Sequence, residues 1–217
     1  MGNLYHVTTR ENAELIKKQG FKAWFTHTEG GRAAEKARAI LAKQDEELEE
    51  DERECLYDDE CEISDEEMAR EIFDQILAMN RRKVDPALPG HSGTVFFWSN
   101  PDEAEYRRRI VDSGSIRQHV ILEVDPSKIP CQCYEADIEL TDELFNEIMG
   151  NLDKAGFCAG QWGLGDEDEE TEEFCDRLDD IATEYYRGMR PFSGRPKFGK
   201  EILCPCNIPK EAVVRAR

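Results

Sequence analysis

The chain has 217 residues, of which 39% are hydrophobic, so it is long enough for one domain with a core and too short for two full domains. No apolar run approaches the ~20 residues that cross a bilayer, and the N-terminus lacks the basic and apolar blocks of a signal peptide. We therefore expect one soluble, cytoplasmic domain over residues 1–217. The net charge of -20 argues at first against nucleic acid as a partner, because like charges repel.

The acidity is concentrated in two blocks. Residues 45–67 hold 15 acids and one base, and residues 166–180 hold 10 acids and one base. The rest of the chain has 23 acids and 26 bases, so it is slightly basic. An anionic ligand outside the two blocks is therefore not excluded.

The N-terminal segment predicts a strand followed by a helix. Leu4–Thr8 is typical of a strand, and Glu11–Gln19 of a helix that Gly20 ends as a C-cap. Residues 21–26 are interpreted as extended. Two helices rich in Ala, Glu, Leu and Lys are then predicted at residues 32–54 and 65–83.

The middle of the chain predicts two strands around a helix. The apolar run TVFFW ends at Trp98, and Asn100 with Pro101 is a strong helix start signal. HVILEVDP, from His119, predicts a buried strand, and IPCQCYEAD, from Ile129, a second extended piece.

Helices are predicted at Thr141–Met149 and at 168–187, and the Gly- and Pro-rich residues 187–200 are interpreted as a loop. EILCP, from Glu201, predicts a last strand, followed by a turn and by EAVVRAR at the end of the chain. Strands and helices are interspersed without regular helical crossovers, which predicts an α+β fold.

Eight cysteines without a secretion signal predict thiols or metal ligands rather than disulfides. Two CxC pairs, Cys131/Cys133 and Cys204/Cys206, would offer four thiolates to zinc if they lay on neighbouring strands. Structural zinc sites usually have CxxC spacing, so buried thiols in a sheet are the favoured interpretation, and no metal site is predicted.

Three polar residues stand in apolar settings: His6, Tyr106 and Glu201. Each alone has an ordinary structural explanation, as a core histidine, a helix residue packed on the sheet and an exposed residue at a strand start.

In combination they resemble a known family. The order LYHVT, helix and Gly, then GTVFFWSNPDEAEY, HVILEVDP and KEILCP is similar to the ADP-ribosyltransferase superfamily. The closest branch includes the poly-ADP-ribose polymerases and the diphtheria-type toxins, whose signature is a His, Tyr, Glu triad. The resemblance runs from Leu4 to Pro209 and implies a split antiparallel β core with flanking helices. Residues 30–90 match nothing in the family and are interpreted as a helical insertion.

The resemblance implies attack on NAD at the carbon that joins nicotinamide to ribose. It assigns His6 to a hydroxyl of the adenosine ribose, the Val7 backbone to the nicotinamide amide and Thr8 to a further hydroxyl contact. A strand holds such groups more rigidly than a loop does.

The same resemblance assigns Tyr106 to stacking on nicotinamide, with Phe96 or Phe97 on the opposite side. Glu201 would bind the 2′-hydroxyl of the nicotinamide ribose and stabilise the positive charge that develops on the sugar. Glu201 is therefore the expected catalytic residue.

The loop before the catalytic glutamate helps to choose the acceptor in this superfamily. Residues 187–200 contain five bases and no acid, which favours an anionic acceptor, either nucleic acid or acidic protein, or help with the NAD pyrophosphate. The expected acceptor-binding residues are Arg190, Phe192, Arg195, Lys197 and Phe198.

Two positions depart from the family pattern. Gly199 stands where arginine-modifying relatives have a Glu or Gln, which disfavours arginine as the target. Glu103 stands where polymerase relatives have the serine that contacts the nicotinamide amide.

Three functions follow from these residues. The leading one is an NAD-dependent mono-ADP-ribosyltransferase that modifies a protein or nucleic acid. The alternatives are an NAD glycohydrolase, and an inactive binding module whose acidic helices at 45–67 engage a basic protein partner. A metal-binding protein built on the CxC pairs is a fourth, weaker interpretation.

Overall fold

The computed structural model describes residues 2–23, 64–113, 118–160, 169–195 and 197–217. Its centre is a seven-stranded antiparallel sheet with the strand order β5-β4-β6-β2-β1-β3-β7. The strands are β1 (Leu4–Thr9), β2 (Val95–Trp98), β3 (His119–Val124), β4 (Tyr134–Asp137), β5 (Arg190–Pro191), β6 (Lys200–Cys204) and β7 (Val213–Ala216). The prediction of an α+β fold is confirmed.

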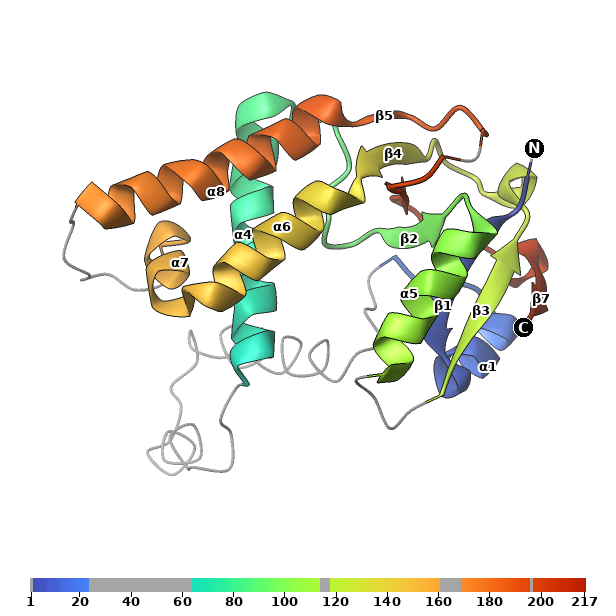
Figure 1. The fold of residues 1–217 in the computed structure, drawn as a ribbon. Helices are drawn as coiled ribbons and strands as arrows, with labels where there is room; N and C mark the ends of the chain where they lie inside the picture. The colour runs from blue at the N-terminus through green and yellow to red at the C-terminus, as the bar shows by residue number, and fades with distance from the viewer. Residues whose placement is uncertain (1, 24–63, 114–117, 161–168, 196) are drawn as a thin grey trace, which may run out of the picture.

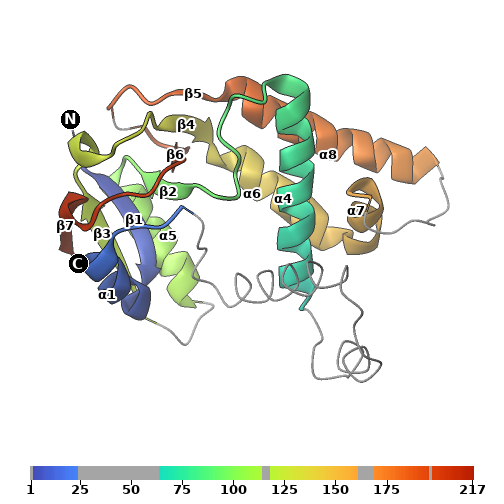
Figure 2. The same ribbon diagram turned by 180° about the vertical axis from the view of Figure 1, so that it is seen from behind.

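The helices form two groups. The α-helices are α1 (Arg10–Gln19), α4 (Asp65–Val84), α5 (Pro101–Ser113), α6 (Ile138–Gly150), α7 (Leu152–Cys158) and α8 (Glu169–Gly188). Figure 1 shows α4, α6, α7 and α8 gathered on one side of the molecule, while α1 and α5 lie beside β1 and β3. Seen from behind, α4 crosses both α6 and α8 (Figure 2).

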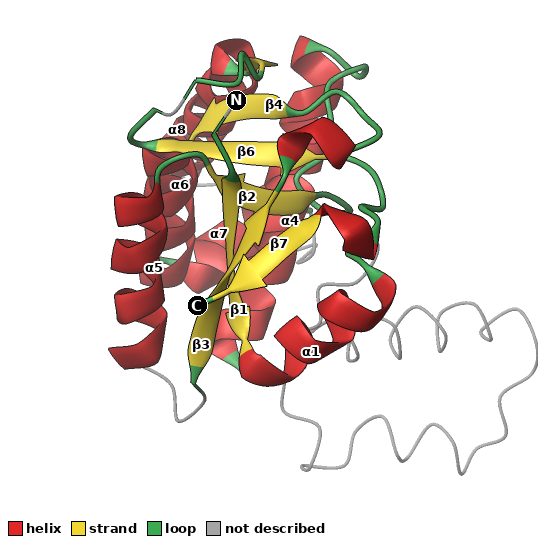
Figure 3. Cartoon of the chain, turned by 90° about the vertical axis from the view of Figure 1, so that its right-hand side faces the viewer, coloured by secondary structure: helices red, strands yellow, loops and turns green. Residues whose placement is uncertain are grey.

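The sheet is split between β1 and β2. β1 pairs with β3 along its whole length, from Leu4↔Val124 to Thr9↔His119, but with β2 only at Tyr5↔Trp98. β4 and β6 consequently run across the direction of β1 and β3 (Figure 3). On the β1 and β3 side, α1 and α5 lie on opposite sides of the sheet (Figure 3).

Two apolar clusters cover the two faces of the sheet. Leu203 of β6 packs with the inward faces of α4, α6 and α8, whereas Ile202 packs with α1 and Phe97. This alternation follows from the two-residue period of a strand. β6 is buried on both faces, so its side chains point either to the helical layer or to α1.

Helix α4 belongs to the core of the domain. Ser64 and Glu67 form a capping box at its N-terminus, and its buried residues recur at helical spacing: Ala69, Ile72, Phe73, Ile76, Leu77 and Asn80. They pack against Leu144 and Ile148 of α6 and Leu178 of α8. The part of the expected insertion that the structure describes is thus integral to the fold, whereas the helix predicted at 32–54 lies outside the described residues.

Several predicted boundaries were wrong. α6 begins at Ile138 rather than Thr141, because Asp137 accepts a hydrogen bond from the Glu139 amide and caps it. α7 and β7 were not predicted. Residues 187–200 contain the short strand β5, which pairs with β4.

In the part of the chain that the structure describes, no helix is both long and apolar enough to cross a membrane.

Gly20 provides a test of this architecture. It has a φ of 79°, and a Cβ there would lie 2.2 Å from the Ile208 carbonyl oxygen, where Phe21 and Ile208 form an isolated bridge. Gly160 has a similar φ of 73° but open space around its Cβ position. We expect Gly160→Ala to cost about 1–2 kcal/mol, from left-handed strain alone.

Gly20→Ala adds a backbone clash to the same strain, so its cost in free energy of unfolding should be clearly larger. Urea denaturation of both variants measures this difference. Equal losses would show that the contact between Gly20 and Ile208 does not constrain the fold.

Candidate functional site

His6 lies at the split between β1 and β2. Its Nδ1 is 2.8 Å from the Phe96 carbonyl oxygen, and its ring packs against Phe21 and Phe97 at centroid distances of 5.0 and 5.7 Å. Because a carbonyl oxygen only accepts, Nδ1 carries the hydrogen of this bond. The imidazole therefore bonds to the carbonyl that would accept from the Val7 amide if the β1–β2 ladder continued.

The ladder between β1 and β2 ends at Tyr5, before Val7. The Arg10 amide donates to the Gln118 carbonyl, so the even residues of β1 direct their backbone groups toward β3. Val7 directs its N–H and C=O to the other side, where the β2 ladder has already ended at Tyr5. In the described part of the chain, Val7 has no ladder partner in β2.

Glu201 lies on β6, opposite Trp98, on the face that the helical layer covers. Its side chain is only 5% exposed, and its Oε1 accepts a hydrogen bond of 2.9 Å from the Tyr185 hydroxyl of α8. Burial raises the pKa of the Glu201 carboxyl, against the opposing influence of His91 and of the Tyr185 hydroxyl. Burial, together with the Glu201 charge, also raises the pKa of Tyr185 well above its ordinary value.

A second buried carboxyl lies on α5. Oε1 of Glu103 accepts a hydrogen bond of 3.2 Å from the Gly199 amide, which ties α5 to the turn before Glu201. Burial is the main cause that raises the pKa of Glu103. Arg107, one turn along α5, forms an ion pair of 2.7 Å with Asp142 of α6.

Among the described residues, some buried side-chain atoms of β2 and α5 have no hydrogen-bond partner. They include Nε1 of Trp98, Oε2 of Glu103 and Nε of Arg107. Trp98 is the cross-strand neighbour of Glu201, and Arg107 and Glu201 interact electrostatically. The other such atoms belong to Gln75, Arg81, Glu135 and Tyr186. Unpaired buried polar groups are costly, so a polar ligand that bonded the three atoms near Glu201 would remove that cost.

The structure does not bring the predicted triad together. Cross-strand partners share a face of a sheet, so the register Tyr5↔Trp98↔Glu201 puts Glu201 on the face opposite to His6. Tyr106, on α5, is 59% exposed. His6 and Glu201 therefore flank the sheet instead of lining one surface.

The other predicted NAD-binding residues are also divided. Thr8 is buried on the His6 side of β1, and Phe97 is fully buried in the cluster with α1. Phe96 faces the helical layer, where its ring lies 4.5 Å from that of His91. Sequence reasoning missed His91 and Tyr185, because neither lies in a family-like motif.

The predicted acceptor loop is partly neutralised. Lys197 pairs with Glu135, and Phe192 packs partly buried against the α1 cluster. Arg190 donates to the carbonyls of Arg187 and Met189. Arg195 is exposed, and Phe198 is 68% exposed, so these two residues remain available to a partner.

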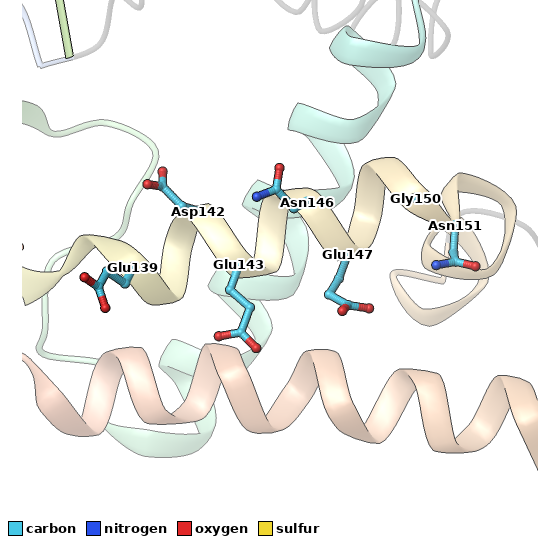
Figure 4. Close-up of a pocket in the computed structure, with 7 residues that line it drawn as sticks. All are labelled: Glu139, Asp142, Glu143, Asn146, Glu147, Gly150 and Asn151. Carbon is cyan, nitrogen blue, oxygen red and sulfur yellow. The ribbon is translucent and has the colours of Figure 1, made fainter. Parts of the chain in front are cut away.

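Two surface hollows lie along α6 and α5. One, of about 560 Å³, lies along α6 and is acidic; Figure 4 shows Glu143 and Glu147 directed toward α8. Its lining residues are Glu139, Asp142, Glu143, Asn146, Glu147, Gly150 and Asn151. The other, of about 770 Å³, runs along α5 and includes Arg10, Arg108, Arg109 and Arg217. Neither is lined by His6, Val7 or Glu201.

The prediction of thiols holds for two of the described cysteines and is wrong for four. Cys133 and Cys204 are free and buried. Disulfides join Cys131 to Cys206 and Cys158 to Cys175. Each bond connects elements that pack side by side, α7 with α8 and the two CxC segments with each other, an arrangement that cysteine spacing alone does not reveal.

No known protein family, curated protein or solved structure matches this chain.

The Tyr185–Glu201 bond predicts a pH-dependent stability. The folded pKa of Glu201 is raised, so its contribution is complete below its unfolded pKa and declines as the pH rises through the folded pKa. Tyr185→Phe removes a donor that favours the ionised carboxylate and so raises this pKa further. We expect the variant to lose about 1–3 kcal/mol, with a larger loss at pH 8 than at pH 4.

The control is the same substitution in a Glu201→Gln background. The amide oxygen of the introduced glutamine still accepts a hydrogen bond but does not ionise, so the pH dependence of the loss should disappear. Urea denaturation at both pH values measures it, and a loss that is independent of pH in the original background would contradict the assignment.

Proposed function

We propose that the chain is an NAD-dependent mono-ADP-ribosyltransferase that modifies a macromolecular acceptor, with Glu201 as the catalytic residue. The observation that carries this proposal is the early end of the β1–β2 ladder, which leaves Val7 without a ladder partner in β2 among the described residues. A primary amide presents one carbonyl acceptor and an N–H donor, which complement the backbone N–H and C=O of one strand residue. The nicotinamide amide is such a group.

The position of Glu201 supports the same proposal. It lies two strands from Tyr5 in one cross-strand row, a separation of ~10 Å between backbones, and Val7 is two residues further along β1. A nicotinamide held at Val7 would have its ribose directed across β2 toward Glu201. The side chain of Val7 shares the face of Tyr5, so the ligand would enter on the side of α5 and the helical layer.

NAD binding at this site requires one exchange of hydrogen bonds. In the structure, Glu201 accepts a hydrogen bond from the Tyr185 hydroxyl. The 2′-hydroxyl of the ribose is a donor of the same type, so it would replace the Tyr185 hydroxyl when that ring withdraws. The ionised Glu201 would then stabilise the oxocarbenium character of the sugar as nicotinamide leaves.

His6 takes a different role in this proposal from the one that the resemblance implied. Its bond occupies the Phe96 carbonyl, and so would leave the Val7 amide to bind the ligand. It acts as a positioning residue. Arg195 and Phe198, exposed in the loop before Glu201, would contact the acceptor.

The inactive binding module is the second candidate function. The burial of Glu201 and its separation from His6 favour the binding module. A catalytic glutamate would have to reach the ligand, and the predicted triad would have to share one surface. The acidic residues predicted to engage a basic partner, at 45–67, lie outside the described residues as far as residue 63. Among the described acids, those exposed at the start of α8, including Glu169, Glu170 and Glu172, would meet the same partner.

Nicotinamide release from NAD by the purified protein distinguishes these functions, with mass spectrometry for ADP-ribose on added protein, DNA and RNA. We expect release by the wild type and a loss of at least ~100-fold in Glu201→Gln, as for removal of an electrostatic stabiliser. Glu123→Gln is the matched control, since Glu123 is also a buried strand carboxylate, but is paired with Arg215.

Each outcome decides between the candidates. Release without a modified acceptor would favour an NAD glycohydrolase. Release that survives Glu201→Gln would remove Glu201 from the chemistry. No release by the wild type, with all acceptors present, would overturn both enzymatic functions in favour of the binding module.

Val7→Pro tests the backbone edge directly. Proline removes the N–H of Val7, which has no ladder partner among the described residues, so we expect little change in the urea midpoint. Nicotinamide release should fall at least tenfold, whereas Val7→Ala, which keeps the N–H, should retain it. Equal activities of the two variants would show that the Val7 amide does not bind the substrate.

A further inference from the structure

Four cysteines gather at one end of the β4–β6 ladder. The last paired residues are Tyr134 and Leu203, and the same register continued beyond them puts Cys133 opposite Cys204 and Cys131 opposite Cys206. The disulfide between Cys131 and Cys206, with a Cα–Cα distance of 6.3 Å, agrees with that register. The two CxC segments therefore lie side by side, so their four sulfurs are neighbours in two adjacent cross-strand rows.

All four side chains face the same way. Gln132 and Pro205, the middle residues of the two CxC motifs, are exposed, while the cysteines on either side pack into the cluster with α1. This alternation is what an extended segment imposes. Cys133 is 7% exposed and Cys204 is fully buried, so this pair lies beneath the partly buried Cys131 and Cys206.

The inner pair consists of two free, buried thiols in one cross-strand row, because the continued register puts Cys133 opposite Cys204. With the two sulfurs of the next cross-strand row, they form a set of four soft ligands on one face. Four thiolates in such a set suit a tetrahedral zinc ion better than any hard cation.

We propose that the chain binds one Zn²⁺ through Cys131, Cys133, Cys204 and Cys206 when the Cys131–Cys206 disulfide is reduced. The sulfurs of a disulfide are poor metal ligands, and in the oxidised form the described residues contain no group of three or more ligands arranged for a metal. The site is thus present only in the reduced protein.

The chemistry balances with a thiol reductant. Two molecules of a low-molecular-weight thiol reduce the Cys131–Cys206 bond, giving two cysteine thiols and one disulfide of the reductant. The four cysteine thiols then release four protons as they bind Zn²⁺. Cys131 and Cys206 lie outside the regular strands, since β4 begins at Tyr134 and β6 ends at Cys204, so their segments can close around the ion.

The test uses the full chain, prepared with and without a thiol reductant, incubated with zinc sulfate and desalted. Zinc per chain is measured by elemental mass spectrometry, and Co²⁺ substitution reports the ligand geometry. We expect one zinc per chain in the reduced protein, none in the oxidised protein, and the absorption of tetrahedral thiolate-bound cobalt. Cys133→Ser and Cys206→Ser should each lose the metal.

The double variant Cys158→Ser, Cys175→Ser is the matched control, because it removes the other described disulfide, between α7 and α8. It should retain zinc. Cys206 is only partly buried, so Cys206→Ser keeps the test decisive if Cys133→Ser does not fold. Zinc retained in Cys206→Ser, or folded, reduced wild type that takes up no zinc, would overturn the proposal. So would a second disulfide between Cys133 and Cys204 in the presence of zinc and reductant.

Discussion

The hydrogen bond between the His6 imidazole and the Phe96 carbonyl is the constraint on which the shape of the sheet depends. If Phe96 instead accepted from the Val7 amide, β1 and β2 would pair beyond Tyr5 and the sheet would be continuous. With that acceptor occupied by a side chain, β4 and β6 turn across β1 and β3 while still sharing β2 with them (Figure 3). The bond of one histidine in an apolar strand thus stands at the point where the β1–β2 ladder ends.

The polar groups around Glu201 are the second unusual feature of the structure. A buried carboxyl with one hydrogen bond and a raised pKa is costly to keep, and Trp98 and Glu103 add buried atoms without partners. A fold selected for stability alone would replace such groups with apolar residues of similar volume. Their retention in adjacent elements is easier to explain if a ligand with several hydroxyl and amide groups completes their hydrogen bonds. NAD has such groups.

The sequence predicted most elements and less of the site. β1, α1, α4 and α8 were predictable because caps, periodic apolar residues and Gly20 mark them locally, whereas α7 and β7 carry no comparable signal. The opposed placement of His6 and Glu201 was not predictable, since it depends on the register between β1, β2 and β6, which distant contacts set. The contact of Tyr185 with Glu201 depends likewise on how α8 crosses the sheet.

Strand β6 connects the two proposed sites. Glu201 faces the helical layer and Cys204, three residues later, faces the α1 cluster, so one short strand has a carboxylate on one side and a thiol on the other. β6 is also paired on both edges, with β2 and β4. Cys204 and Glu201 are thus held by the same five residues of backbone, and the pairing of β6 with two neighbouring strands fixes both positions. The proposed metal site and the proposed NAD site therefore depend on the register of one strand.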